Sequence, residues 1–202
     1  SRTETDAGEY DVEFEKDPVN NKDQTGNYIV KGTENGQLVI TANETEVVVK
    51  ITGHKTEETY DGDTHKAEGY NVSISNDLYK ESDFTFTGTA KVEGTNADTY
   101  QIGLNEGQFT NNNANFKKVT FVVEDGQLVI KPREVTLKAN SGKFDYDRNP
   151  KTVSGFTCWD VETQKEVTGL QFDEIIASRT ETDAGEYDVE FEKDPVNNKD
   201  QT

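Results

Sequence analysis

The sequence is poor in the residues that protein sites most often use for chemistry. Its 202 residues include one cysteine, two histidines, four prolines and no methionine. The lone Cys158 excludes an intrachain disulfide, and the absence of a CxxC pair or a His/Cys cluster leaves no zinc-binding pattern. We expect Cys158 to be a small buried residue beside Trp159. The longest apolar runs, such as residues 128–130, have the length of a strand and not of a membrane span.

Basic residues are also scarce, and this limits the partners of the chain. There are 21 Lys and Arg against 40 Asp and Glu, which gives a formal net charge of −19. Phosphate backbones and anionic lipid headgroups repel such a chain, so we expect no nucleic-acid partner and no membrane insertion in this segment. Without methionine or a signal-peptide pattern, we interpret the sequence as an interior piece of a longer protein.

An internal repeat is the strongest pattern in the sequence. Residues 1–25 recur letter for letter as residues 178–202, which indicates a tandem array with a period of 177 residues. A diverged repeat of about half that length lies within it. The segment GQLVI occurs at residues 36–40 and 126–130. EVVVK, which begins at Glu46, is echoed by EVTLK from Glu134.

These landmarks predict where the domains begin and end. We expect a complete domain at residues 45–132, which we call the A module. Residues 1–44 are predicted to be the C-terminal half of a B-type domain, and residues 133–202 the N-terminal part of the next one. A half-domain exposes strand edges and an apolar face. We therefore expect neighbouring copies to complete one another head to tail, unless sequence outside this chain does so.

Alternation with a period of two predicts strands along most of the chain. The alternating apolar positions are Tyr10, Val12 and Phe14; Val72 and Ile74; Phe84 and Phe86; Tyr100, Ile102 and Leu104; and Val119, Phe121 and Val123. We expect an all-β fold, or a β-rich one with at most a short helical turn within residues 76–83. Small β-sandwich domains with short linkers would form a semi-rigid rod. The Asn-Gly and Asp-Gly pairs at residues 34–36 and 124–126 predict tight hairpins into each GQLVI strand.

Four short motifs carry a resemblance to a known family. Tyr60-Asp61-Gly62 follows an opening strand, TNADTY and TDAGEY precede later strands, and GQLVI closes each module. The chain resembles the MBG and YDG-type repeat domains of bacterial cell-surface proteins. It departs from the pattern in having Tyr146-Asp147-Arg148 and Asn96-Ala97-Asp98. The resemblance implies arrays in extracellular adhesins and stalks on the bacterial surface, with no chemistry attached to the motifs.

The candidate metal and catalytic residues are few. Asp61, Asp63, Asp145 and Asp147 are calcium candidates, but the twelve-residue loop with a closing Glu is absent, and solvated turn carboxylates are the alternative. The histidines His54 and His65 have no Ser or Cys nucleophile pattern beside them. We therefore predict no enzyme, no catalytic or cofactor-binding residue and no cofactor.

Aromatic and polar residues offer the remaining candidates. Tyr70, Tyr79 and Trp159 would stack on sugar rings if exposed, whereas core packing is the alternative. The asparagine-rich run at residues 111–115 is interpreted as a polar loop, with a recognition loop as the sharper alternative. A Lys–Asn isopeptide bond would need a buried lysine on a first strand, where Lys50 and Lys138 are the examples.

The repeat and the family resemblance lead to two hypotheses about function. The first is a structural stalk or spacer, in which tandem modules extend other domains away from a bacterial surface. The second is an adhesive module, in which the repeats themselves recognise a host glycan or protein and gain strength from multiple weak contacts.

Overall fold

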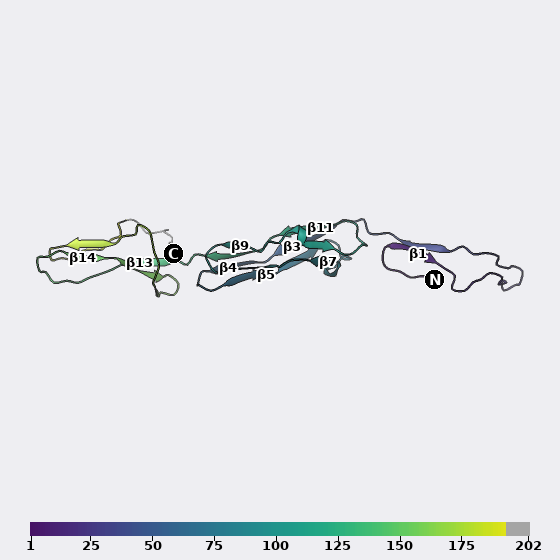
Figure 1. Ribbon diagram of the computed structural model, residues 1–202, viewed down its shortest axis with the longest axis horizontal. Helices are drawn as coiled ribbons and strands as arrows, with labels where there is room; N and C mark the ends of the chain where they lie inside the picture. Colours follow the sequence, from purple (N-terminus) through teal and green to yellow (C-terminus); the bar gives the residue numbers. More distant parts are fainter. Residues whose placement is uncertain (193–202) are drawn as a thin grey trace. The chain divides into compact units, whose positions relative to one another are not determined.

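The structure is a computed structural model that describes residues 1–192 (Figure 1). The chain divides into two compact units. The first unit comprises residues 1–58 and 62–131, and the second comprises residues 59–61 with the residues from 132 onward. The second copy of the repeat, residues 178–202, therefore lies within the described residues only as far as Glu192.

The described residues form strands almost throughout, which confirms the all-β fold. The strands are β1 (Gly8–Val12), β2 (Gly36–Ile40), β3 (Val47–Gly53), β4 (Lys55–Thr59), β5 (His65–Glu68), β6 (Tyr70–Ile74), β7 (Phe84–Phe86), β8 (Lys91–Gly94), β9 (Thr99–Gln101), β10 (Phe109–Asn111), β11 (Val119–Glu124), β12 (Gln127–Lys131), β13 (Val135–Ala139), β14 (Lys151–Ser154), β15 (Phe156–Asp160), β16 (Glu166–Val167) and β17 (Ser178–Glu181). Two 3-10 turns interrupt them, Glu81–Asp83 and Glu106–Gln108. The first lies within the predicted helical turn. Neither comes near the length and apolarity of a membrane-crossing helix, and no other helix occurs in the described part of the chain.

The first unit has a core at one end of the A module, between a three-stranded sheet and a ribbon. The sheet has the order β11-β3-β6, and the ribbon pairs β10 with β7. Alternate residues of β3 (Val47, Val49 and Ile51) are fully buried because they all face this ribbon. Phe84 and Phe109 of the ribbon pack against them, so this core is rich in aromatic side chains.

A second core lies at the other end of the same module. Here the sheet β4-β12-β9 packs on the ribbon β5-β8. Its buried side chains are Ala67, Ile102, Leu104, Leu128 and Ile130. Leu128 is fully buried and Ile130 nearly so, which makes the GQLVI strand the centre of this core.

Three extended runs pass from one core to the other and change sheets at glycines. The runs are β3 to β4, β5 to β6, and β11 to β12, and they bend at Gly53, Gly69 and Gly126; we call this place the crossing. His54 donates its backbone N–H to the carbonyl of Gly69 at 3.1 Å. A Cβ atom on Gly126 would collide with the carbonyl oxygen of His54, and one on Gly53 would collide with the backbone of Gly126. The crossing therefore requires glycine for close backbone approach.

The two predicted hairpins are wrong. β11 and β12 lie in different sheets, because β11 pairs in parallel with β3 whereas β12 pairs with β9. Asp125 accepts hydrogen bonds from the backbone N–H groups of Gly103, Leu104 and Gly126, and so fastens the bend. In residues 1–44, the strand β2 pairs with β1, and the residues just before Gly36 form no strand.

The N-terminal segment repeats one strand pair of the A module. β1 pairs antiparallel with β2, and Tyr10 lies opposite Leu38. β9 pairs with β12 in the same way, with Tyr100 opposite Leu128. The register is the same in both pairs, so the diverged repeat seen in the sequence is also a repeat of strand pairing.

The second unit holds a three-stranded sheet and a two-stranded ribbon. The sheet has the order β13-β15-β16, and the ribbon pairs β14 with β17. Cys158 of β15 is buried, as predicted. Both clusters of buried hydrophobic residues found among residues 1–192 lie in the A module, so the second unit has the smaller core.

Candidate functional site

The predicted aromatic candidates differ in their exposure. Tyr79 is 1% exposed, and its hydroxyl donates to Asn111 Oδ1 at 2.8 Å. Burial raises the pKa of Tyr79 to about 12. Tyr70 is half-buried and meets two phenylalanine rings edge-on. These two tyrosines belong to the core, whereas Trp159 is 37% exposed and keeps an accessible surface.

The carboxylate candidates do not gather into a metal site within residues 1–192, where no group of three or more His, Cys, Asp or Glu is arranged to hold a metal ion. Asp147 instead contacts Lys151 Nζ at 2.7 Å and accepts the backbone N–H of Asn149. These contacts, the lysine first, lower the pKa of Asp147 to about 2. Asp61, Asp63 and Asp145 likewise join no such group in that part of the chain.

The remaining candidates from the sequence include His54, Lys50 and Lys138. The His54 ring contacts the Glu68 carbonyl at 2.7 Å and Asn71 Oδ1 at 3.3 Å, so it braces the crossing. Lys50 and Lys138 are exposed. An isopeptide bond needs a buried lysine, and neither residue meets that condition.

The asparagine-rich run at residues 111–115 contacts the linker between β2 and β3 in the first unit. Asn115 donates through Nδ2 to Asp6 Oδ1 at 2.9 Å, and its carbonyl accepts the backbone N–H of Asn43. Next to it, Lys117 Nζ lies 2.8 Å from Glu44 Oε1, and this hydrogen bond lowers the pKa of Glu44. The run therefore holds residues 43–44, the segment that leads from β2 to β3.

A buried ion pair in the second unit was not foreseen from the sequence. Asp160 is 3% exposed and accepts hydrogen bonds from Arg133 and from the backbone N–H of Thr163. The guanidinium, followed by the Thr163 N–H, holds the pKa of Asp160 far below its usual range. Arg133 also donates to the carbonyl oxygen of Tyr60 at 3.4 Å. The only sequence signal was the position of Arg133 immediately after Pro132, at the start of the B-type segment.

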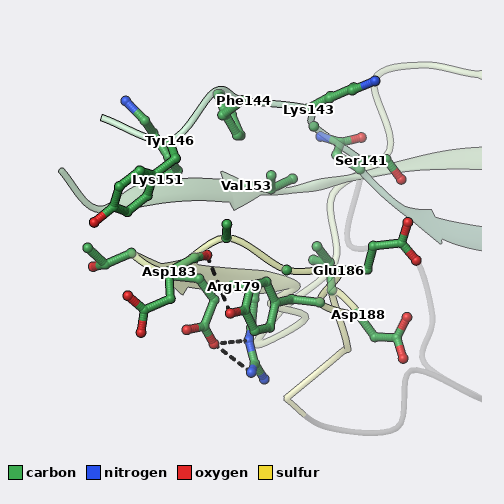
Figure 2. Close-up of a pocket in the computed structure, with 18 of the residues that line it drawn as sticks. Ser141, Lys143, Phe144, Tyr146, Lys151, Val153, Arg179, Asp183, Glu186 and Asp188 are labelled. Atoms are coloured by element: carbon green, nitrogen blue, oxygen red, sulfur yellow. Dashed lines mark hydrogen bonds and ion pairs between the residues drawn. The ribbon is translucent and has the colours of Figure 1, made fainter. Parts of the chain in front are cut away.

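An open groove of about 1170 Å³ lies in the second unit. Figure 2 shows the loop with Lys143, Phe144 and Tyr146 on one side of Val153. Arg179 and residues 181–190 line the other side. Phe144 is 54% exposed, so apolar surface faces the solvent here.

The framework around this groove repeats that of the A module. Asn140 takes the place of His54: its backbone N–H donates to the carbonyl of Gly155, and its side chain donates to the carbonyl of Ser154 at 2.9 Å. Gly155 has a positive φ of 83°, as Gly69 has at 87°. The ribbon of β14 and β17 corresponds to the ribbon of β5 and β8.

One strand of the A module has no counterpart among the described residues of the second unit. In the A module, β12 lies between β4 and β9 and packs on the ribbon β5-β8. Residues 141–145 follow β13 as β4 follows β3, and residues 186–188 correspond to β9, yet none of these residues forms a strand. The groove therefore lies where the A module has its GQLVI strand.

Comparison with known proteins identifies the A module. The family model named MBG domain matches residues 46–132. No curated protein matches the chain, and no solved structure matches it. Residues 46–132 of the chain are therefore a domain of the MBG family.

Proposed function

We propose that the chain is part of an extracellular stalk on a bacterial surface, in which tandem modules extend other domains from the cell. The proposal is supported by the family of residues 46–132 and by the repeat of residues 1–25. The observation that carries it is the path of the chain through the A module.

The polypeptide enters the A module at one end and leaves it at the other (Figure 1). It enters at Val47, which pairs with Val119 in the first core. It leaves at Lys131, whose ammonium lies 2.5 Å from Glu57 Oε2 beside the second core. The run of residues 47–59 spans about 40 Å at the rise of an extended strand. Each module of this kind adds its length to the array instead of turning the chain back.

The junctions before and after the module are short. Six residues separate Ile40 of β2 from Val47 of β3, and three separate Lys131 of β12 from Val135 of β13. The contacts of Asn115 and Lys117 hold the first junction, and Pro132 restricts φ in the second. Short junctions that are restricted in this way favour a stiff array of modules over a flexible one.

Small-angle X-ray scattering of chains with one, two and three 177-residue repeats tests this function. A stalk predicts that the maximum dimension grows in proportion to repeat number, by about 80 Å per repeat if each of its two modules is about 40 Å long. Growth with the square root of repeat number would show a flexible string and contradict the proposal.

An adhesive role for the repeats is the alternative, and the accessible Trp159 is the residue that favours it. A glycan array probed with the 202-residue chain and with Trp159→Ala separates the two functions. Reproducible binding that the substitution abolishes would support adhesion by the repeat. Length growth without glycan binding would support the stalk.

A further inference from the structure

We propose that the A module is a load-bearing clamp, in which the first and last runs of chain are joined in parallel so that tension along the chain strains all of their contacts at once. A spacer needs only length, so resistance to pulling goes beyond the proposed stalk role. The proposal rests on contacts within the first unit, and it does not depend on where the protein resides.

The two runs that carry the load lie beside each other. The chain enters the A module through residues 43–58, the entry run, and leaves it through residues 115–131, the exit run. β3 of the entry run pairs in parallel with β11 of the exit run, from Val47 opposite Val119 to Thr52 opposite Glu124 (Figure 1). Beyond the crossing, β4 of the entry run is the neighbour of β12 of the exit run.

Backbone hydrogen bonds extend this pairing beyond the two strands. They are the bonds from Asn43 N–H to the Asn115 carbonyl (2.7 Å), from Lys117 N–H to the Asn43 carbonyl (3.1 Å), from Val47 N–H to the Lys118 carbonyl (2.8 Å) and from Gln127 N–H to the His54 carbonyl (3.1 Å). The entry run is therefore bonded to the exit run from before β3 to past the bend at Gly53.

Side chains join the same two runs along their length. The contacts are Lys117 Nζ with Glu44 Oε1 (2.8 Å), Thr120 Oγ1 with Glu46 Oε1 (3.0 Å), Lys55 Nζ with Glu124 Oε1 (2.9 Å) and Lys131 Nζ with Glu57 Oε2 (2.5 Å). Exposed contacts of this kind add little to equilibrium stability. Here each of them also opposes movement of one run along the other.

The parallel direction decides how tension acts on these contacts. Tension reaches the entry run at its start and the exit run at its end. In this pair the two starts lie together, with Val47 beside Val119, and so do the two ends, with Glu57 beside Lys131. Pulling therefore slides one run along the other and strains all their contacts together. A single hydrogen bond contributes little, so the resistance comes from the number that must break at once.

The first core opposes the same sliding movement. Val47, Val49 and Ile51 of β3 are 0% exposed and pack in the cluster that contains Phe84 and Phe109 of the ribbon β10-β7. A slip of one residue would turn these three side chains toward the opposite face of the sheet. The entry run can therefore move along the exit run only if this core opens as well.

Single-molecule force spectroscopy on the full chain, in a Cys158→Ala background, tests the geometry. Handles attached through Thr45→Cys and Pro132→Cys pull along the two runs, whereas handles at Thr45→Cys and Lys118→Cys pull the two starts apart. Opening through the first pair of handles should release about 250 Å of chain, which identifies the A module.

We expect the pull along the runs to need a force about twofold higher or more, because the contacts between the runs break together in that direction and one after another in the other. Equal forces in the two directions, or a lower force along the runs, would overturn the proposal.

Two proline substitutions compare a loaded contact with an unloaded one. Because Val47 donates to the Lys118 carbonyl, alternation along the strand directs the N–H of Thr120 toward β3. Thr120→Pro removes that hydrogen bond and the hydroxyl contact with Glu46. The control is Thr110→Pro in the ribbon β10-β7, where the flanking bonds direct the Thr110 N–H toward the residue opposite it.

Both prolines should lower the stability measured by urea unfolding, but forced unfolding depends on the rate at which the loaded contacts break. We expect Thr120→Pro to lower the force along the runs by about a third, and Thr110→Pro to change it by about a tenth or less. Equal losses would overturn the proposal.

Circular dichroism shows whether each variant is folded, and if Thr120→Pro is not, the two pulling directions in the chain without proline substitutions decide the question. A low force along the runs would overturn the clamp and leave the predicted growth of length with repeat number unaffected. The clamp and the stalk therefore fail separately.

Discussion

One sequence occurs twice in this molecule and forms different strands in its two places. In the first copy, residues 8–12 form β1, while residues 1–4 form no strand. In the second copy, Ser178–Glu181 form β17, while residues 185–189 form no strand. The copies are identical in sequence, so the difference comes from what lies beside them.

The short-range contacts are the same in both copies. Arg2 Nε contacts Glu4 at 2.8 Å, and Arg179 Nε contacts Glu181 at 2.8 Å. Each arginine lies over the tyrosine ring that follows it. Each of these tyrosines also donates its hydroxyl to the carbonyl oxygen four residues before it. Local contacts follow the local sequence, whereas strand formation depends on a partner that is distant in the sequence.

Adding a partner strand to the second unit should produce the largest effect. Appending the sequence of residues 26–44 after Thr202 supplies a GQLVI strand to the second unit. Burial of its Leu and Ile should stabilise this unit by a few kcal/mol, since each contributes about 1.5–3 kcal/mol before the cost of ordering the strand. Urea unfolding followed by Trp159 fluorescence measures the gain, and hydrogen exchange should show new protection at residues 185–189.

The matched control carries Asp in place of that Leu and Ile. It should behave like the unextended chain. Equal stabilisation by both extensions would mean that the strand does not occupy the groove, and the comparison of the two copies would lose its explanation.

Truncating Leu128 in the A module and the equivalent Leu38 in the N-terminal segment compares how well the two strand pairs are packed. Leu128→Ala removes a fully buried side chain and should cost about 2–5 kcal/mol. Leu38→Ala removes a half-buried side chain at the same register position and should cost about 1 kcal/mol or less. Chemical denaturation followed by circular dichroism measures both. Equal costs would show that the N-terminal strand pair is as well packed as the A module.

Much of the fold was predictable because it depends on short-range pattern. Alternation located β1, β6, β7, β9 and β11, since a half-buried strand repeats every two residues. The burial of Cys158 and the MBG family of residues 46–132 were also predicted correctly.

The features that could not be predicted depend on contacts between distant parts of the chain. An Asp-Gly pair between two apolar runs fits a hairpin, but Gly126 instead packs against Gly53 where two runs change sheets. The asparagine run holds a linker through Asn115, and this role needs Asp6 and Asn43 to be brought beside it. The alternation of apolar residues predicts which face of a strand is buried, but it does not predict which other strand pairs with it.

Substituting Gly126 at the crossing and the equivalent Gly36 of β2 compares the packing of the crossing with that of the β1-β2 pair. A Cβ on Gly126 would collide with the His54 carbonyl and approach Ile102 Cδ1 at 2.7 Å, whereas one on Gly36 would meet only Val12 Cβ at 3.7 Å. Gly126→Ala should therefore destabilise the A module by about 1–3 kcal/mol. Gly36→Ala should change stability by about 0.5 kcal/mol or less. Thermal unfolding measures both, and a mild Gly126→Ala would show that the crossing is loosely packed.

The smallest effect should come from a local contact in the second unit, the hydrogen bond between Lys151 and Asp147. The pKa of Asp147 is lowered from 3.8 to about 2, so its contribution to stability is present above pH 4 and is lost as the pH falls toward 2. Asp160, whose pKa is also lowered, adds to the loss in acid. Lys151→Met should lower the melting temperature slightly at pH 7 and reduce its fall between pH 4 and pH 2, as measured through Trp159 fluorescence. An unchanged pH profile would mean that the contact does not stabilise the unit, and that its ribbon depends on strand pairing alone.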